Sequence, residues 1–163
     1  MVAKRKKVSD IGDIRMGYTI PFWSDGAWSM HELLEYVLEF TGRSKVLITA
    51  FSINEESIRA LLNLKSNGLI YQLDCLFNTQ ITRFKADLLP FVENIADSIR
   101  LAPCHAKVFI IEGAFRVCVI ASANMTNNLR YEAGVICADS KIIDNFIEEV
   151  YKSYNKDTPL DYA

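Results

Sequence analysis

The chain is poor in features that mark secreted, membrane-spanning and metal-dependent proteins. Its 163 residues include four widely separated cysteines that form no C-x-x-C pair: Cys75, Cys104, Cys118 and Cys137. This spacing indicates neither a zinc site nor a disulfide framework, and three of the thiols lie in apolar runs typical of a core. No apolar run approaches the ~18 residues that a membrane span requires, and the polar start lacks a signal peptide's apolar stretch. We therefore expect a cytoplasmic protein without metal, cofactor or stable membrane association.

Excess positive charge is also absent. The 18 Lys and Arg residues are outnumbered by 20 Asp and Glu residues, and the formal net charge is −2. The chain thus lacks the overall basic field of a dedicated DNA-binding protein, but it is compatible with an enzyme that has a local basic cleft. Half of the residues are apolar, which is enough for one globular domain.

One short basic run stands apart from the rest of the chain. Residues 4–7 read Lys-Arg-Lys-Lys within a segment of weak patterning. We interpret residues 1–16 as a basic, flexible N-terminal segment and residues 17–163 as the folded domain. A nucleic-acid-binding arm is the alternative for the basic run.

Helical and strand patterns alternate along the domain. Ser29 with Glu32, and Ser52 with Glu55, have capping-box spacing, which predicts that a helix begins at each pair. Glycines offer left-handed ends to these two helices. Apolar runs predict strands at residues 46–51, 69–77, 98–101, 107–111, 116–121 and 134–138, one short strand within 17–28, a partly helical crossover at 79–95 bent at Pro90, and a last helix at 142–151.

This order of elements predicts the fold class. Helices that alternate with strands require a parallel or mixed sheet, because each crossover returns the chain to the same edge. We expect an α/β domain with a mixed, mostly parallel sheet flanked by helices on both faces.

The chain has two histidines, and their contexts differ. His31 lies in the first turn of an expected helix, which is typical of a surface or cap-adjacent residue. His105 opens a strand, and Lys107 projects from the same face because alternate strand residues share a face. Ser122 and Asn124 are related in the same way at the end of the next strand. If the two strands form a hairpin, these four side chains converge.

The four side chains suit a phosphodiester. Lys107 supplies positive charge for the non-bridging oxygens, and Asn124 donates amide hydrogens. Ser122 can orient the histidine or hold an oxygen, and His105 is the residue able to attack phosphorus near neutral pH. Carboxylates do not cluster in the sequence, so protein donors alone are expected to stabilise the developing charge. H-x-K or S-x-N alone is a weak signal, whereas the two on successive strands are more specific.

The segments H-A-K-V-F-I-I-E and A-S-A-N resemble the HKD motif of phospholipase D-like proteins, H-x-K, four residues, D, six residues, then G-S-x-N. The resemblance extends over residues 43–151. N-N-L-R-Y-E is similar to the loop that brings an active-site glutamate, which is Glu132 here. The sequence departs from the motif in three ways: Glu112 replaces the supporting Asp, Ala121 replaces Gly, and the hairpin is two residues longer.

The resemblance implies a two-step, metal-independent transfer through a phosphohistidine. A second histidine protonates the leaving oxygen and then activates water. Because the chain has one H-x-K, we expect a C2 homodimer in which both copies contribute His105, Lys107, Ser122 and Asn124. Single-motif relatives of this size are mostly nucleases, so the expected activity is a phosphodiesterase acting on nucleic acid.

Cationic and polar residues outside the motif are candidates for substrate contacts. Arg130 and Ser52 are predicted to bind the substrate, although a surface salt bridge is the alternative for Arg130. Arg116, Lys152 and the basic run at 4–7 are further candidates for phosphate contacts.

Two other functions stay open. A catalytically weak nucleic-acid-binding or assembly module with the same fold would explain the acidic balance, Glu112, Ala121 and the longer hairpin. A phospholipid headgroup hydrolase or transferase would require a membrane-facing apolar rim, and no such stretch stands out.

Overall fold

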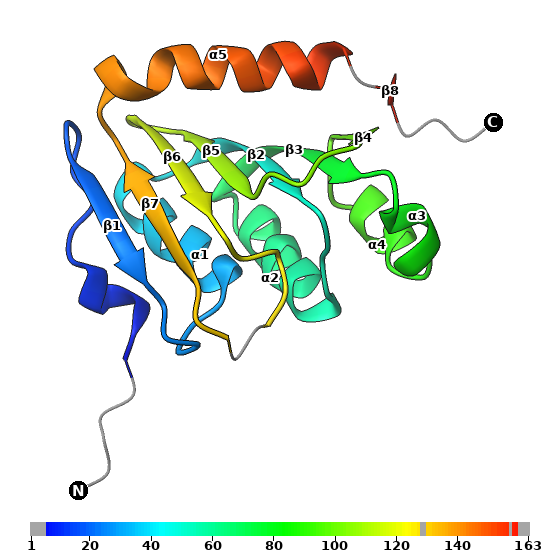
Figure 1. Cartoon of the computed structure of the whole chain (residues 1–163), viewed down its shortest axis with the longest axis horizontal. Helices are drawn as coiled ribbons and strands as arrows, with labels where there is room; N and C mark the ends of the chain where they lie inside the picture. The colour runs from blue at the N-terminus through cyan, green and yellow to red at the C-terminus, as the bar shows by residue number, and fades with distance from the viewer. Residues whose placement is uncertain (1–5, 128–129, 157, 160–163) are drawn as a thin grey trace, which may run out of the picture.

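The computed structural model describes residues 6–127, 130–156 and 158–159, in which one mixed sheet is covered by helices (Figure 1). The eight strands lie in the order β1-β7-β6-β5-β2-β3-β4-β8. The strands are β1 (Thr19–Trp23), β2 (Ser44–Ala50), β3 (Ile70–Asn78), β4 (Ser98–Ala102), β5 (Val108–Glu112), β6 (Arg116–Ala121), β7 (Ala133–Cys137) and β8 (Thr158–Pro159). The α-helices are α1 (Met30–Thr41), α2 (Glu55–Ser66), α3 (Ile81–Phe84), α4 (Leu89–Glu93) and α5 (Ser140–Lys156), and a 3-10 helix, η1, spans Val8–Ile11.

The strand pairing corrects one part of the predicted fold class. β2–β3 and β3–β4 are parallel, and every other pair within the described sheet is antiparallel. The mixed α/β sheet with helices on both faces is confirmed, but the expectation of a mostly parallel sheet is wrong. The reason is that β5, β6 and β7 follow one another without a crossover helix, and direct connections produce antiparallel neighbours.

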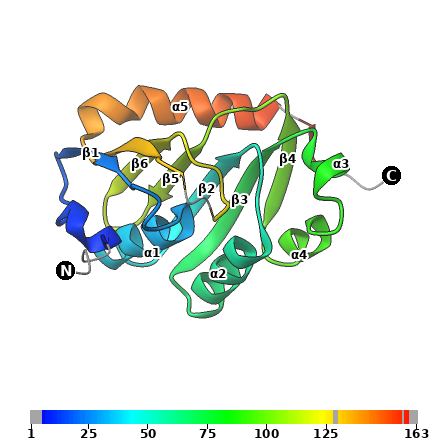
Figure 2. The same ribbon diagram turned by 60° about the horizontal axis from the view of Figure 1, so that its bottom comes forward.

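The core has two layers, one on each face of the sheet. In Figure 2, α5 covers one face, whereas α1, α2 and α4 lie on the other. Alternate residues of β5 serve the two layers: Phe109 and Ile111 pack towards α1 and α2, and Val108 and Ile110 pack towards α5. All four are buried, as expected for a strand that is covered on both faces.

The cysteines belong to this core, as the apolar runs predicted. Cys75, Cys118 and Cys137 are buried, and Cys104 is half-buried; none forms a disulfide. Burial raises the pKa of the Cys75 thiol and raises that of Cys118 to about 12. These two thiols therefore stay protonated near neutral pH and act as small apolar side chains.

The predicted start and end of α1 are confirmed. The Ser29 hydroxyl accepts a hydrogen bond from the backbone N–H of Glu32, and the Glu32 carboxylate accepts one from the backbone N–H of Ser29, at 2.6 Å. After the helix, Gly42 has a φ of 67°, a conformation that L-residues avoid. Both ends of α1 are thus determined by local sequence.

The predicted start of α2 is wrong by two residues. Asn54, not Ser52, caps the helix, and its side-chain oxygen accepts a hydrogen bond from the backbone N–H of Ser57 at 2.9 Å. The cause is a contact with a distant segment: Ile53 forms a parallel bridge with Met125, and the N–H of Asn54 donates to the Met125 carbonyl at 3.0 Å. This pairing keeps the chain extended until residue 54.

The N-terminal segment is less separate from the domain than predicted. Within residues 1–16, η1 is helical, and Ile14 is 2% exposed against the core. The Tyr36 hydroxyl of α1 donates to the Gly12 carbonyl at 3.0 Å. The part from residue 8 onward therefore packs on α1 because it carries apolar residues of its own; residues 1–5 lie outside the described range.

His31 lies beside the cap of α1, but it is not at the surface. Its ring is 7% exposed, and Nδ1 lies 3.1 Å from the Ser57 hydroxyl, so the ring links α1 to α2. Burial lowers the pKa of His31, and the nearby Glu32, Glu56 and Glu35 oppose this shift. The ring therefore favours its neutral form in the folded protein.

Acidification is expected to destabilise the protein through His31. The unfolded chain binds a proton at His31 near the ordinary pKa of 6.5, whereas the folded chain binds it only at lower pH. The free energy of unfolding therefore falls as the pH drops below 6.5. Urea unfolding above and below this pH measures how much the free energy of unfolding decreases on acidification. This decrease should be smaller for His31→Gln than for the wild type. Equal losses in the two proteins would exclude His31 as the cause.

Candidate active site

The predicted site residues, apart from Glu112, gather at one edge of the sheet. β2, β3 and β4 end at this edge with their carboxyl ends, β5 and β7 begin there, and β6 ends there. His105 and Lys107 lie in the segment between β4 and β5, and Ser122 directly follows β6. The predicted hairpin of β5 and β6 is confirmed, and the N–H of Ala121 donates to the Lys107 carbonyl at 3.0 Å. Carboxyl ends of parallel strands are a common location for ligand sites.

His105 and Lys107 form a direct pair. The Lys107 ammonium donates to His105 Nδ1 at 3.0 Å and to the His105 carbonyl at 2.8 Å. An ammonium group has no acceptor, so Nδ1 must present its lone pair. A neutral His105 ring in this conformation therefore carries its proton on Nε2. The ring itself is exposed.

Two buried polar side chains of neighbouring strands hold the H-x-K segment. The Thr49 hydroxyl of β2 donates to the Ala106 carbonyl and accepts from the N–H of Val108, both at 3.0 Å. The Asn78 side chain of β3 donates to the Cys104 carbonyl at 2.8 Å. Sequence reasoning missed Thr49 and Asn78. Thr49 is the one polar residue in the run 46–51, which was an available signal, whereas Asn78 ends a strand that also contains Gln72 and Asp74 and gave no such signal.

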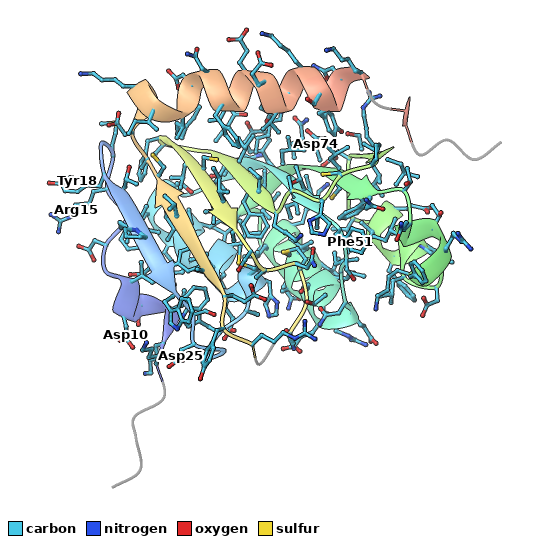
Figure 3. The ribbon with its side chains drawn as sticks, viewed as in Figure 1. Asp10, Arg15, Tyr18, Asp25, Phe51 and Asp74 are labelled. Atoms are coloured by element: carbon cyan, nitrogen blue, oxygen red, sulfur yellow. The ribbon has the colours of Figure 1, made fainter. Side chains whose placement is uncertain are left out.

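Asn124 connects the S-x-N segment to the loop after β2. Its side-chain oxygen accepts from the backbone N–H groups of Phe51 and Ser52, at 3.0 and 3.3 Å. Phe51 in turn packs against His105, with 5.2 Å between the ring centres. Figure 3 labels Phe51 near the middle of the view, below α5. The Asn124 oxygen is thus occupied by backbone, and its NH₂ group is the part suited to a ligand.

Ser122 and Glu132 form the other pair of the site. The Ser122 hydroxyl donates to the Glu132 carboxylate and accepts from the N–H of Ala133 at 3.1 Å. The N–H of Ser122 also donates to the Ala133 carbonyl at 2.9 Å. The structure therefore brings Glu132 to the end of β6, beside the S-x-N segment.

The structure also locates the two predicted substrate contacts. Arg130 is exposed in the segment before β7, two residues from Glu132. Ser52 is half-buried, and its backbone N–H is the group that contacts Asn124.

Glu112, the predicted supporting carboxylate, lies at the other end of β5. It accepts a hydrogen bond from the Tyr151 hydroxyl of α5 at 2.7 Å. The pKa of Tyr151 is raised by burial first and then by this bond to Glu112. Glu112 therefore attaches α5 to the sheet and does not touch the His105–Lys107 pair.

Other cations proposed as phosphate contacts are engaged elsewhere. Arg116 begins β6, far from Ser122, and its guanidinium lies 3.1 Å from Asp144. Lys152 pairs with carboxylates of its own helix, Glu148 and Glu149. Neither cation belongs to the site, because each forms ion pairs with carboxylates of α5. In the basic run, Lys6 lies 3.7 Å from Asp25, and Lys4 and Arg5 are outside the described residues.

The described residues lack a metal-binding cluster and a membrane-spanning helix. They contain no cluster of three or more His, Cys, Asp or Glu side chains placed to bind a metal ion. No helix among residues 6–127 and 130–156 is both long and apolar enough to cross a bilayer.

Sequence comparison finds no match, whereas structural comparison finds proteins of similar fold. No family model matches the chain, and no curated protein matches it. Nuc of Salmonella typhimurium, a phospholipase D family member, superposes with a TM-score of 0.66 and 17% identity over 89% of this chain and 99% of its own. NucT from Helicobacter pylori gives 0.60 and 15% over 88% of this chain and 100% of its own.

A third similar structure is TrmBL2, an archaeal chromatin protein described with a novel mode of DNA binding. It gives a TM-score of 0.56 and 12% identity over 86% of this chain and 54% of its own. At these identities the similarity establishes the fold and nothing finer. Together with the confirmed β5–β6 hairpin and its flanking segments, it shows that the protein has the phospholipase D-like fold.

Proposed function

We propose that the protein is a metal-independent phosphodiesterase, specifically a nuclease, that acts through a phosphohistidine at a site shared across a homodimer. The observation that carries this proposal is the His105–Lys107 pair, which lies at the same sheet edge as Asn124 and Ser122. An imidazole beside a fixed ammonium group and amide donors can both attack and stabilise a phosphoryl group.

The reaction proceeds in two displacements. In the first, Nε2 of one His105 forms a bond to phosphorus while the bond from phosphorus to the leaving oxygen breaks. The partner subunit's His105, in its imidazolium form, gives its Nε2 proton to that oxygen and becomes neutral. In the second, the same ring takes a proton from water, the water oxygen bonds to phosphorus, and the N–P bond breaks. Both histidines then regain their starting forms, and the substrate has gained one water molecule.

Both roles of His105 require a proton on Nδ1, so the bond from Lys107 to Nδ1 must first be released. The acid must start as the imidazolium, which carries a proton on both ring nitrogens, whereas a ring whose Nδ1 accepts from Lys107 is neutral. For the attacking ring, Nε2 must be unprotonated, so Nδ1 must carry the proton instead. Binding of a phosphate draws the Lys107 ammonium towards the non-bridging oxygens and releases Nδ1 for that proton.

An apolar surface beside the site is the proposed dimer contact. A groove between β6, β7 and α5 is lined mainly by apolar side chains, and three of these are exposed: Ile120, Ile142 and Phe146. On α5, Ile143 and Ile147 are buried against the sheet, whereas Ile142 and Phe146 are exposed. Since Ile120 precedes Ala121 and Ser122, a second copy on this surface brings two sites together.

Metal independence and a covalent intermediate provide the test of this proposal. Purified protein should hydrolyse bis(4-nitrophenyl) phosphate and single-stranded DNA equally well with and without EDTA, because no step uses a cation. Rapid acid-free denaturation during turnover should capture a phosphorus–nitrogen adduct that peptide mapping assigns to His105. A divalent-dependent nuclease serves as the control for chelation. Complete inhibition by EDTA would count decisively against the mechanism.

A binding module without turnover is the second candidate. It is favoured by the similarity to TrmBL2, a protein with a described mode of DNA binding, and by the Lys107 contact that occupies Nδ1 of His105. Binding of DNA with no adduct and no cleavage in the same experiment would establish this candidate in place of the first.

A further inference from the structure

Two large aromatic side chains stack on each other at the surface. The rings of Trp23 and Tyr131 lie 5.5 Å apart between centres with an interplanar angle of 30°. Trp23 is nevertheless 54% exposed and Tyr131 is 71% exposed. Exposed aromatic rings of this size cost solvation free energy and often indicate a binding surface. Neither ring is needed to fill the core.

The aromatic pair lies next to the candidate active site. Trp23 ends β1 and pairs with Ala133, whose N–H donates to the Ser122 hydroxyl at 3.1 Å. On the other side, the N–H of Ser24 donates to the Glu132 carbonyl at 2.8 Å. Neighbouring strands are about 4.8 Å apart, so the backbone of Trp23 is about 10 Å from that of Ser122. The aromatic pair therefore flanks the Ser122–Glu132 side of the candidate active site.

We propose that Trp23 and Tyr131 form a stacking platform for an unpaired base next to the cleaved phosphate, which makes single-stranded nucleic acid the preferred substrate. This inference rests on the proposed function for the nature of the phosphodiester. An aromatic face accepts any base that is not already stacked between neighbours, and bases in a duplex are so stacked.

The charge of the protein supports stacking as a main source of affinity. The formal net charge is −2, and Arg116 and Lys152 are held in ion pairs with carboxylates. Attraction of the phosphate backbone alone is therefore weak. Arg130 is exposed and adjacent to Tyr131, so a strand on the aromatic pair can place a phosphate beside this guanidinium.

Fluorescence quenching of Trp23 tests the platform without requiring turnover. The only other tryptophan, Trp28, is 8% exposed, so a stacked base quenches mainly Trp23. The binding of a short oligothymidylate and of an abasic strand of equal length is compared by quenching and by anisotropy. Trp23→Ala should weaken binding of the oligothymidylate about tenfold and leave the abasic strand unchanged. Trp23→Phe, which keeps an aromatic face, should restore most of the affinity.

Three outcomes would overturn the platform. The first is an equal effect of Trp23→Ala on the two strands, and the second is the same loss for a duplex. The third is dissociation of the dimer by Trp23→Ala in light scattering, because Thr19, on the same face of β1, lines the apolar groove. Since binding is measured, a protein that does not cleave can still support the platform. Conversely, if the protein is an active nuclease but binds the abasic strand as tightly as the oligothymidylate, the platform is wrong and the proposed function stands.

Discussion

His105→Ala is expected to lower kcat/KM for a phosphodiester by about 10³-fold or more, because the variant lacks both the nucleophile and the acid of the shared site. The side chain is exposed, so its removal opens no cavity in the core and should change the free energy of unfolding little. The measurements are steady-state kinetics on bis(4-nitrophenyl) phosphate and urea unfolding of the same preparation. Full activity in a folded variant would remove His105 from the mechanism.

Mixed dimers distinguish a shared site from two independent ones. If each dimer has one site built from two His105 rings, a dimer of wild-type and His105→Ala subunits lacks one of the two rings and is inactive. Activity after co-refolding should therefore fall with the square of the wild-type fraction, not in proportion to it. The control is an excess of a variant that cannot dimerise. This variant should leave the activity of the wild-type dimers unchanged, because it does not exchange subunits with them.

The local parts of this site were predictable from sequence because they follow local rules. Close spacing in the sequence placed His105 with Lys107, although both precede β5 and do not lie in a strand, and the short connection between two apolar runs predicted the β5–β6 hairpin. The capping box of α1 depends on Ser29 and Glu32 alone and was confirmed for the same reason. In each case the interacting residues are close in sequence, so few alternative arrangements compete.

The remaining features depend on contacts between distant segments. The start of α2 moved to Asn54 because Ile53 pairs with Met125, a partner that no local pattern indicates. Thr49 holds the H-x-K segment by two hydrogen bonds and Asn78 by one, and a polar residue within or at the end of a strand has several possible explanations. The expectation of parallel strands was wrong for β5, β6 and β7, because direct connections join them in place of crossover helices. Tertiary contacts decided each of these features, and single-sequence reasoning cannot assign their partners.

Ile142→Asp is expected to convert the protein into an inactive monomer. Ile142 is 62% exposed on α5 in the single chain, so the substitution leaves the core untouched. In the proposed dimer it places two carboxylates in an apolar contact, which weakens association by about 3 kcal/mol per uncompensated charge, or roughly 100-fold. Sedimentation equilibrium gives the mass, and hydrolysis of bis(4-nitrophenyl) phosphate gives the activity. Phe91→Asp on α4, at a side chain 59% exposed, is the matched control and should leave both unchanged.

The value of Ile142 for this test lies in its distance from the chemistry. α5 follows the carboxyl end of β7, whereas His105, Lys107 and Ser122 lie at the opposite edge of the sheet. A loss of activity in Ile142→Asp can therefore arise only through the assembly, provided that circular dichroism shows an intact fold. A monomeric and fully active Ile142→Asp protein would mean that one His105 suffices. A dimeric and active one would move the subunit contact to a different surface.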